Sequence, residues 1–169
     1  MRIAATGDCN YKGRWAYEQG KTILYKIRYT VFMDDVKCGF REREHTADWE
    51  LEVWAPDLCM LLEQAAHGMY ALSGTRLVES PRQERTFEIR HYDSESLMVR
   101  FLSELLYFGE QEGLAFDQFN LCLQQNSLKA VVSGAAVVVQ DKEIKAVTYH
   151  NLAVKRTDQG LRVCIVFDV

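Results

Sequence analysis

The chain has 169 residues, of which 48% are hydrophobic and 26% charged, and its formal net charge is −4 at pH 7. This length and balance fit one globular domain with an ordinary core and exclude disorder over most of the chain. Because a mildly acidic protein has no general attraction for phosphate backbones, we expect no direct binding to nucleic acid.

The opening segment differs in charge from the rest of the chain. Residues 1–32 contain six Lys or Arg and two Asp or Glu. Residues 33–169 contain fourteen Lys or Arg and twenty-two Asp or Glu. The opening segment also sustains no helical or strand period. We therefore treat residues 1–36 as an N-terminal extension of unknown role, or as the product of a wrongly assigned start, and residues 37–169 as the domain.

Strand and helix patterns become clear from Gly39 onward. Apolar and acidic side chains alternate from Trp49 to Trp54, which predicts a strand with one buried face. Apolar residues recur at helical spacing from Leu58 to Leu72. The expected elements, in chain order, are strands at 40–44 and 49–54, a helix at 58–72, a strand at 83–91, a helix between Asp93 or Ser94 and Gly113, and strands at 119–124, 128–133, 136–139, 144–155 and 161–169.

This order of elements excludes a regular alternation of parallel strands and helices. It predicts the α+β class, with a mostly antiparallel sheet and two helices packed on one face. Asp158, Gln159 and Gly160 form a turn signal, so we expect the last two strands to make a hairpin.

The cysteines and the hydropathy pattern bear on the compartment. The five cysteines show no closely spaced pair, and we expect buried reduced thiols rather than disulfides or zinc ligands. No apolar stretch is long enough to span a membrane, and no secretory signal is visible. These features indicate a cytoplasmic protein without a membrane partner.

Two aspartates are placed where they could share a cation. Asp48 ends the turn before the second strand, and Asp168 lies beside the terminal Val169. If the last strand ends near that turn, the side chains of Asp48 and Asp168 and the α-carboxylate of Val169 converge. Such a cluster of three carboxyl groups must take up a proton or a cation. Oxygen ligands select hard ions such as Ca²⁺ or Mg²⁺. The alternative is that Asp48 caps a turn and Asp168 is an ordinary exposed residue.

Lys145 precedes a short segment in which Thr148 and His150 share one strand face. Lys145 is either a solvated residue at a strand edge or a functional surface residue, and the polar pair faces either water or a partner. No phosphate loop, dinucleotide fingerprint, nucleophile elbow or zinc-protease helix is present.

Three strings of residues together resemble the archease family. They are HTAD at 45–48, KAVTYH at 145–150 and FDV at 167–169, supported by LEV at 51–53 and by RFLSELLY at 100–107 on the second helix. The resemblance covers residues 37–169. It implies a compact α+β fold and an accessory role in tRNA splicing and RNA repair.

The resemblance also implies a partner, a metal and site residues. The partner is a GTP-dependent RNA ligase of the RtcB type, which the protein activates by promoting guanylylation and multiple turnover without being an enzyme itself. The family's metal is described as calcium, with magnesium or manganese as alternatives. Its ligands correspond to Asp48, Asp168 and Val169 in this sequence. His45, Lys145 and His150 stand in the same strings and are expected to serve function or partner contact.

Two other functions stay open at this point. A metal-assisted hydrolase could use Asp48, Asp168 and His45, although no second base or substrate-binding motif is visible. A chaperone-like module could use exposed apolar surface at Trp49, Trp54 or residues 135–139, unless these side chains belong to the core.

Overall fold

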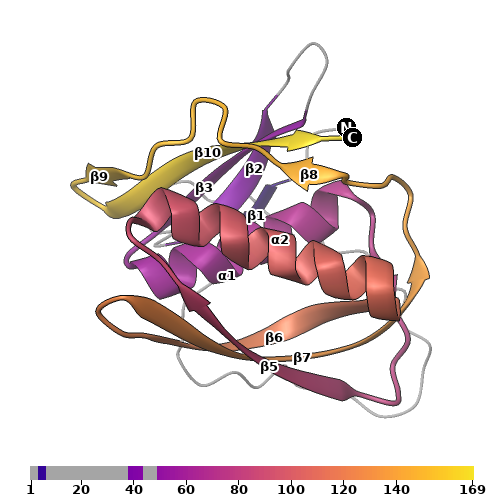
Figure 1. Cartoon of the computed structure of the whole chain (residues 1–169). Coiled ribbons are helices and arrows are strands. Elements are labelled where there is room, and N and C mark those ends of the chain that lie inside the picture. The colour runs from indigo at the N-terminus through magenta and orange to yellow at the C-terminus, as the bar shows by residue number, and fades with distance from the viewer. Residues whose placement is uncertain (1–3, 7–37, 44–48) are drawn as a thin grey trace.

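A computed structural model of the chain describes residues 4–6, 38–43 and 49–169 (Figure 1). The elements, in chain order, are β1 (Ala4–Thr6), β2 (Gly39–Arg43), β3 (Trp49–Ala55), α1 (Leu58–Leu72), β4 (Arg76–Leu77), β5 (Gln83–Arg90), α2 (Ser94–Glu112), β6 (Leu114–Leu123), β7 (Ser127–Val139), β8 (Ala146–Val147), β9 (Lys155–Thr157) and β10 (Gly160–Asp168).

The strands form two antiparallel sheets with the helices between them. The first sheet has the order β1-β2-β3-β10-β8, and β9 also pairs with β10. In the second sheet, β7 lies between β5 and β6, and β4 pairs with the far end of β7. Figure 1 shows α1 and α2 as a middle layer, and α1 contacts β2 and β3 on one side and β6 on the other.

The core follows from the alternation of side chains along β3. Leu51 and Val53 are completely buried toward the helices, whereas Glu50 and Glu52 lie on the opposite face. The helix layer approaches this strand closely, because a Cβ added at Gly68 of α1 would stand 2.5 Å from Leu51 Cδ2. The sequence prediction of a strand with one buried face is therefore confirmed here.

Both helices begin at aspartate caps. Asp57 Oδ1 accepts a hydrogen bond of 2.9 Å from the Met60 N–H, and Asp93 Oδ1 accepts one of 2.6 Å from the Ser96 N–H. The second helix ends at Gly113, whose φ of 66° places it in the left-handed region that glycine tolerates. The predicted cap and end of this helix are confirmed.

The α+β class, the antiparallel pairing, the two helices and the terminal hairpin of β9 and β10 agree with the sequence prediction. The arrangement differs in that the strands divide into two sheets, so that the helices bury a face of each instead of covering one face of one sheet. The expected strand at 136–139 is the end of the long β7, and β6 starts five residues before the expected 119, at Leu114.

The expected strand at 144–155 is wrong for most of its length. Only residues 146–147 and 155–157 pair as strands. After Val147, the Thr148 hydroxyl donates to Val166 O at 3.0 Å, and the Leu152 N–H donates to Tyr149 O at 3.2 Å in a turn. Asn151 adopts a φ of 51° in this turn, so apolar alternation here does not produce a continuous strand.

Three further predictions concern the N-terminal part, the cysteines and the membrane. Residues 4–6 of the extension pair with β2 as β1. Cys38 is disulfide-bonded, so the expectation of reduced thiols throughout is wrong at this position, while Cys59, Cys122 and Cys164 are free. Within the described ranges, neither helix combines the length and apolar character that a bilayer crossing requires.

Candidate functional site

Three segments that are distant in the sequence meet where β10 ends. Phe167 of β10 is paired with Trp49, the first residue of β3, and on its other side with Val147 of β8. Asp168 is paired with Ala146, also of β8. We call the end of β10, residues 167–169, together with residues 145–147 and Trp49, the C-terminal corner.

Lys145 attaches the end of β10 to the segment before β8. Its backbone N–H donates to Asp168 O at 2.8 Å, and its side-chain Nζ donates to Val169 O at 3.0 Å. Both contacts hold the main chain of the last two residues, which leaves the Asp168 side chain free to point into solvent. The proximity of Lys145 to Asp168 and Val169, which the sequence did not predict, is therefore a feature of the fold.

The carboxylate of Asp168 is exposed and makes no hydrogen bond or ion pair with any side chain of residues 38–43 or 49–169. Beside it, the oxygen of Val169 already accepts the Lys145 ammonium. A carboxylate and a main-chain oxygen are hard donors that suit Ca²⁺, Mg²⁺ or Mn²⁺ better than zinc. These two residues are chemically suited to part of an oxygen-ligand site.

Two predicted site residues, His45 and Asp48, lie outside the described residues. Among the described ones, no group of three or more His, Cys, Asp or Glu side chains is arranged to hold a metal ion. The structure describes Asp168 and Val169 but not Asp48, and the role of all three as metal ligands stays a prediction.

His150 lies in the turn that follows β8. Its backbone N–H donates to the Thr148 hydroxyl at 3.3 Å, and its Nε2 lies 2.9 Å from Asn151 Nδ2. Thr148 is directed to Val166 O of β10, so it does not share an exposed strand face with His150 as the sequence suggested. His150 itself is exposed, as a partner-contacting residue must be.

Trp49 brings a second lysine to the corner. The Lys142 ammonium lies 4.5 Å from the centre of the Trp49 ring, a cation–π contact at the first residue of β3. Residue types in the sequence gave no indication of this pairing, because Lys142 and Trp49 are far apart in the chain. Trp49 is half-buried and packs against the core.

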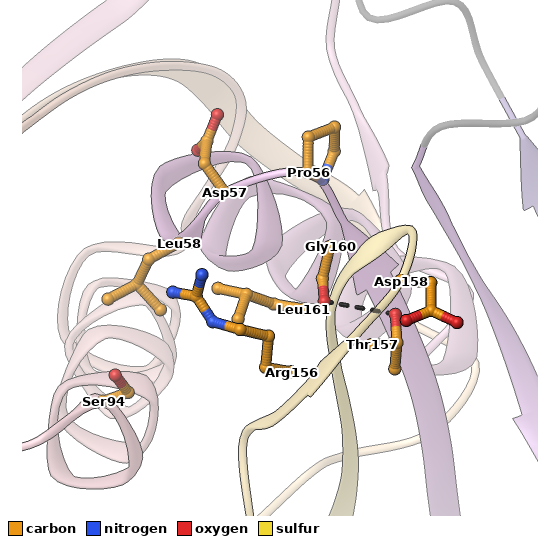
Figure 2. A pocket seen from close by; sticks show the side chains of 9 residues that line it. All are labelled: Pro56, Asp57, Leu58, Ser94, Arg156, Thr157, Asp158, Gly160 and Leu161. Carbon is orange, nitrogen blue, oxygen red and sulfur yellow. Dashed lines mark hydrogen bonds between the residues drawn. The ribbon is translucent and has the colours of Figure 1, made fainter.

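A separate cleft lies at the opposite end of β10, where Gly160 begins the strand. Its volume is about 520 Å³, and Figure 2 shows the residues around it, with Arg156 directed toward Leu58 and Leu161. The Thr157 hydroxyl donates to Gly160 O at 3.1 Å within its wall. Sequence reasoning did not single out this cleft, and none of the predicted site residues lines it.

The outer face of the first sheet carries a buried ion-pair cluster. Glu52 is 4% exposed and accepts Arg41 Nε at 2.6 Å and Arg162 Nη1 at 3.0 Å. Nearby, burial raises the pKa of the Cys164 thiol, which accepts a contact of 3.6 Å from Arg43. This cluster joins β2, β3 and β10, and its contacts are those of a structural network.

Comparison with known proteins identifies the family. The model described as "Archease protein family (MTH1598/TM1083)" matches residues 40–169. The archease of Pyrococcus furiosus is 31% identical over 126 residues, which are 69% of this chain and 88% of that protein. The archease of Methanosarcina acetivorans is 33% identical over 135 residues, which are 75% of this chain and 92% of that protein.

Two solved structures share the fold. The solution structure of protein 1598 from Methanobacterium thermoautotrophicum has a TM-score of 0.59 and 22% identity, covering 77% of this chain and 98% of that one. The crystal structure from Thermotoga maritima, described as an archease and possible chaperone, has a TM-score of 0.56 and 20% identity, covering 83% and 100%. Because the family model matches more than three quarters of its residues and these relatives are 31% and 33% identical to it, the chain belongs to the archease family.

Proposed function

We propose that this protein is a metal-binding accessory factor that activates a GTP-dependent RNA ligase of the RtcB type in tRNA splicing or RNA repair. The observation that carries the proposal is the C-terminal corner in a chain of the archease family. There the exposed Asp168 carboxylate stands at the end of β10, next to the start of β3. The protein supplies the ligase with an acidic surface and not with a catalytic group of its own.

Chain connectivity supports a shared site for Asp48 and Asp168. Trp49 and Phe167 are register partners, which places their Cα atoms about 5 Å apart. Asp48 precedes Trp49 in the sequence and Asp168 follows Phe167, so each aspartate is one residue from this pair. We propose that the two aspartate side chains ligate one ion at this end of the sheet.

The charge of such a corner determines its ligand. Two carboxylates about 4 Å apart repel each other by about 1 kcal/mol in water and by about 4 at an effective dielectric constant of 20. A divalent cation relieves this repulsion, and oxygen donors favour calcium, with magnesium or manganese as alternatives. When bound, such an ion would also neutralise phosphate charge at the nucleotide site of a ligase.

A guanylylation assay tests the proposal directly. The ligase is incubated with radiolabelled GTP, with and without this protein, and the variants Asp48→Asn and Asp168→Asn are compared with Asp158→Asn. Asp158 is the matched control, because it is an exposed aspartate in the hairpin at the opposite end of β10. We expect the first two variants to lose stimulation and the control to retain it. Full stimulation by folded Asp168→Asn and Asp48→Asn would remove the carboxylate mechanism.

A chaperone-like binding module is the second candidate, favoured by the description of the Thermotoga maritima relative as a possible chaperone. The apolar surface that this function would use is narrower than the sequence suggested. Val138 is 60% exposed, but Ala135 is buried and both Trp49 and Trp54 are half-buried. Suppression of aggregation of unrelated clients, with no effect on a ligase, would support this function over activation.

The hydrolase alternative predicts a different result. If the C-terminal corner activates water by itself, the isolated protein should turn over a nucleotide or a phosphoester in the presence of a divalent ion. Turnover that disappears in Asp168→Asn would favour this alternative, whereas stimulation of a ligase without such turnover favours the accessory role.

A further inference from the structure

The Lys145 ammonium donates a hydrogen bond to Val169 O, an oxygen that the proposed cation would also contact. The Lys145 Nζ lies 3.0 Å from Val169 O, and the backbone N–H of Lys145 donates to Asp168 O at 2.8 Å. Within the described ranges, no Asp or Glu side chain forms an ion pair with this ammonium. Its contact in the fold is therefore with the main-chain end of β10, next to the unpaired Asp168 carboxylate.

We propose that Lys145 is a resident counter-ion of the C-terminal corner, which competes with the divalent cation at Val169 and thereby weakens its binding. The inference rests on the proposed function, because it assumes that a cation binds at Asp168 and Val169. It gives Lys145 a role in setting the affinity of the site, and that role has a sign that can be measured.

The sign follows from electrostatics. An ammonium and a divalent ion that contact the same oxygen are separated by no more than the sum of the two contact lengths, about 5.4 Å. Because Lys145 is exposed, the dielectric constant of water applies to the pair. Repulsion between charges of +1 and +2 then weakens cation binding roughly four- to thirteenfold, with the lower value after screening by salt.

A purely structural clasp predicts the opposite sign. If Lys145 mainly holds Val169 in position for the ion, its removal frees the end of the chain and weakens cation binding. The main-chain bond from Lys145 N–H to Asp168 O does not depend on the side chain and remains in Lys145→Met and Lys145→Arg, so β10 stays paired with the β8 segment. The two roles are thus separated by the direction in which the dissociation constant moves.

Lys142 provides a matched control. It is a lysine three positions earlier in the same connection, but its ammonium lies over the Trp49 ring and not on Val169 O. Lys142→Met removes the same charge from the same region of the chain. It therefore measures the long-range part of the effect, whereas Lys145→Met also removes the contact with the oxygen.

Calorimetric titration of the full chain with CaCl₂ tests the inference, using wild type, Lys145→Met, Lys145→Arg, Lys142→Met and Asp168→Asn. We expect calcium to bind Lys145→Met roughly four- to thirteenfold more tightly than wild type. Lys145→Arg should stay near the wild-type value because it keeps the charge, and Lys142→Met should shift by clearly less than Lys145→Met.

The outcomes separate the inference from the proposed function. If wild type binds calcium, Asp168→Asn does not, and Lys145→Met binds equally or more weakly, the counter-ion role is overturned while the metal site stands. If wild type binds no calcium, or Asp168→Asn binds as wild type does, both the proposed site and the counter-ion role are overturned. The inference is supported if Lys145→Met binds calcium more tightly than wild type and Lys142→Met changes the affinity by clearly less.

Discussion

The buried Glu52 cluster offers the sharpest test of what holds the first sheet together. The substitution Glu52→Gln keeps the size of the side chain and removes its charge. The Glu52 side chain is 5% exposed, whereas those of Arg41 and Arg162 are 51% and 46% exposed. The variant therefore removes a buried anion but leaves both cations able to reach water.

The magnitude can be worked from the two contacts. Arg41 Nε and Arg162 Nη1 donate to separate oxygens of Glu52, at 2.6 Å and 3.0 Å. A charge-assisted hydrogen bond contributes about 1.5–3 kcal/mol and a neutral one about 1 kcal/mol. Glutamine keeps one weakened acceptor and turns its amide N–H₂ toward the other arginine, where two donors face each other. After a discount for hydration of the exposed guanidinium groups, we expect a loss of about 2 kcal/mol.

Urea unfolding measured by circular dichroism checks this value. With a slope of about 2 kcal/mol per molar, the midpoint should fall by about 1 M. Glu50→Gln is the matched control on the same strand and face, because its contact with Arg43 is longer, at 3.8 Å, and more exposed. Its free energy of unfolding should change by less than about 0.5 kcal/mol. Equal losses in the two variants would refute the reasoning that burial of Glu52 makes its pairs valuable.

The remaining predictions concern backbone sites and pH. Gly134→Ala should destabilise by more than about 3 kcal/mol, because a Cβ there would stand 1.8 Å from Ala115 O of the neighbouring strand. Gly109→Ala, whose Cβ would meet nothing closer than 3.6 Å, should instead stabilise α2 by about 0.5–1 kcal/mol. Urea unfolding of both variants checks these signs, and a Gly134→Ala variant more stable than Gly109→Ala would contradict them. The Ser96 N–H lowers the pKa of Asp93, so this carboxylate stabilises the fold above about pH 4 and loses that effect as pH falls through its folded pKa. Asp93→Asn should therefore flatten the decline of Tm below about pH 4, and an unchanged slope would contradict the assignment.

Much of the fold follows from local sequence rules. The alternation from Trp49 to Trp54 identifies β3 and its buried face, because each strand side chain has a fixed side. Asp93 and Gly113 identify the two ends of α2 because their caps satisfy free main-chain groups. The split into two sheets is not local, since it depends on β7 pairing with β5 and β6 and on both helices packing between the layers.

The candidate site was predictable in part. Asp168, Val169 and Lys145 were expected from the resemblance to the archease family, and the register of β10 with β8 brings them together. The bond from Lys145 Nζ to Val169 O could not be read from residue types, because a lysine at a strand edge is usually solvated. The contact of Lys142 with Trp49 depends on the same tertiary pairing and has no local signal.

The position of the C-terminal corner explains how its chemistry can vary without loss of the fold. β10 pairs with β3 along residues 161–167 and with β8 at residues 167–168, so Phe167 is held on both sides and Asp168 on one. The core contribution of this region comes from Phe167, which is fully buried, whereas the Asp168 side chain points to solvent. Substitution of an exposed side chain outside a network usually changes stability by less than about 0.5 kcal/mol. A loss of ligase stimulation in Asp168→Asn, with unchanged unfolding, therefore reports on the chemistry of the corner and not on the stability of the protein.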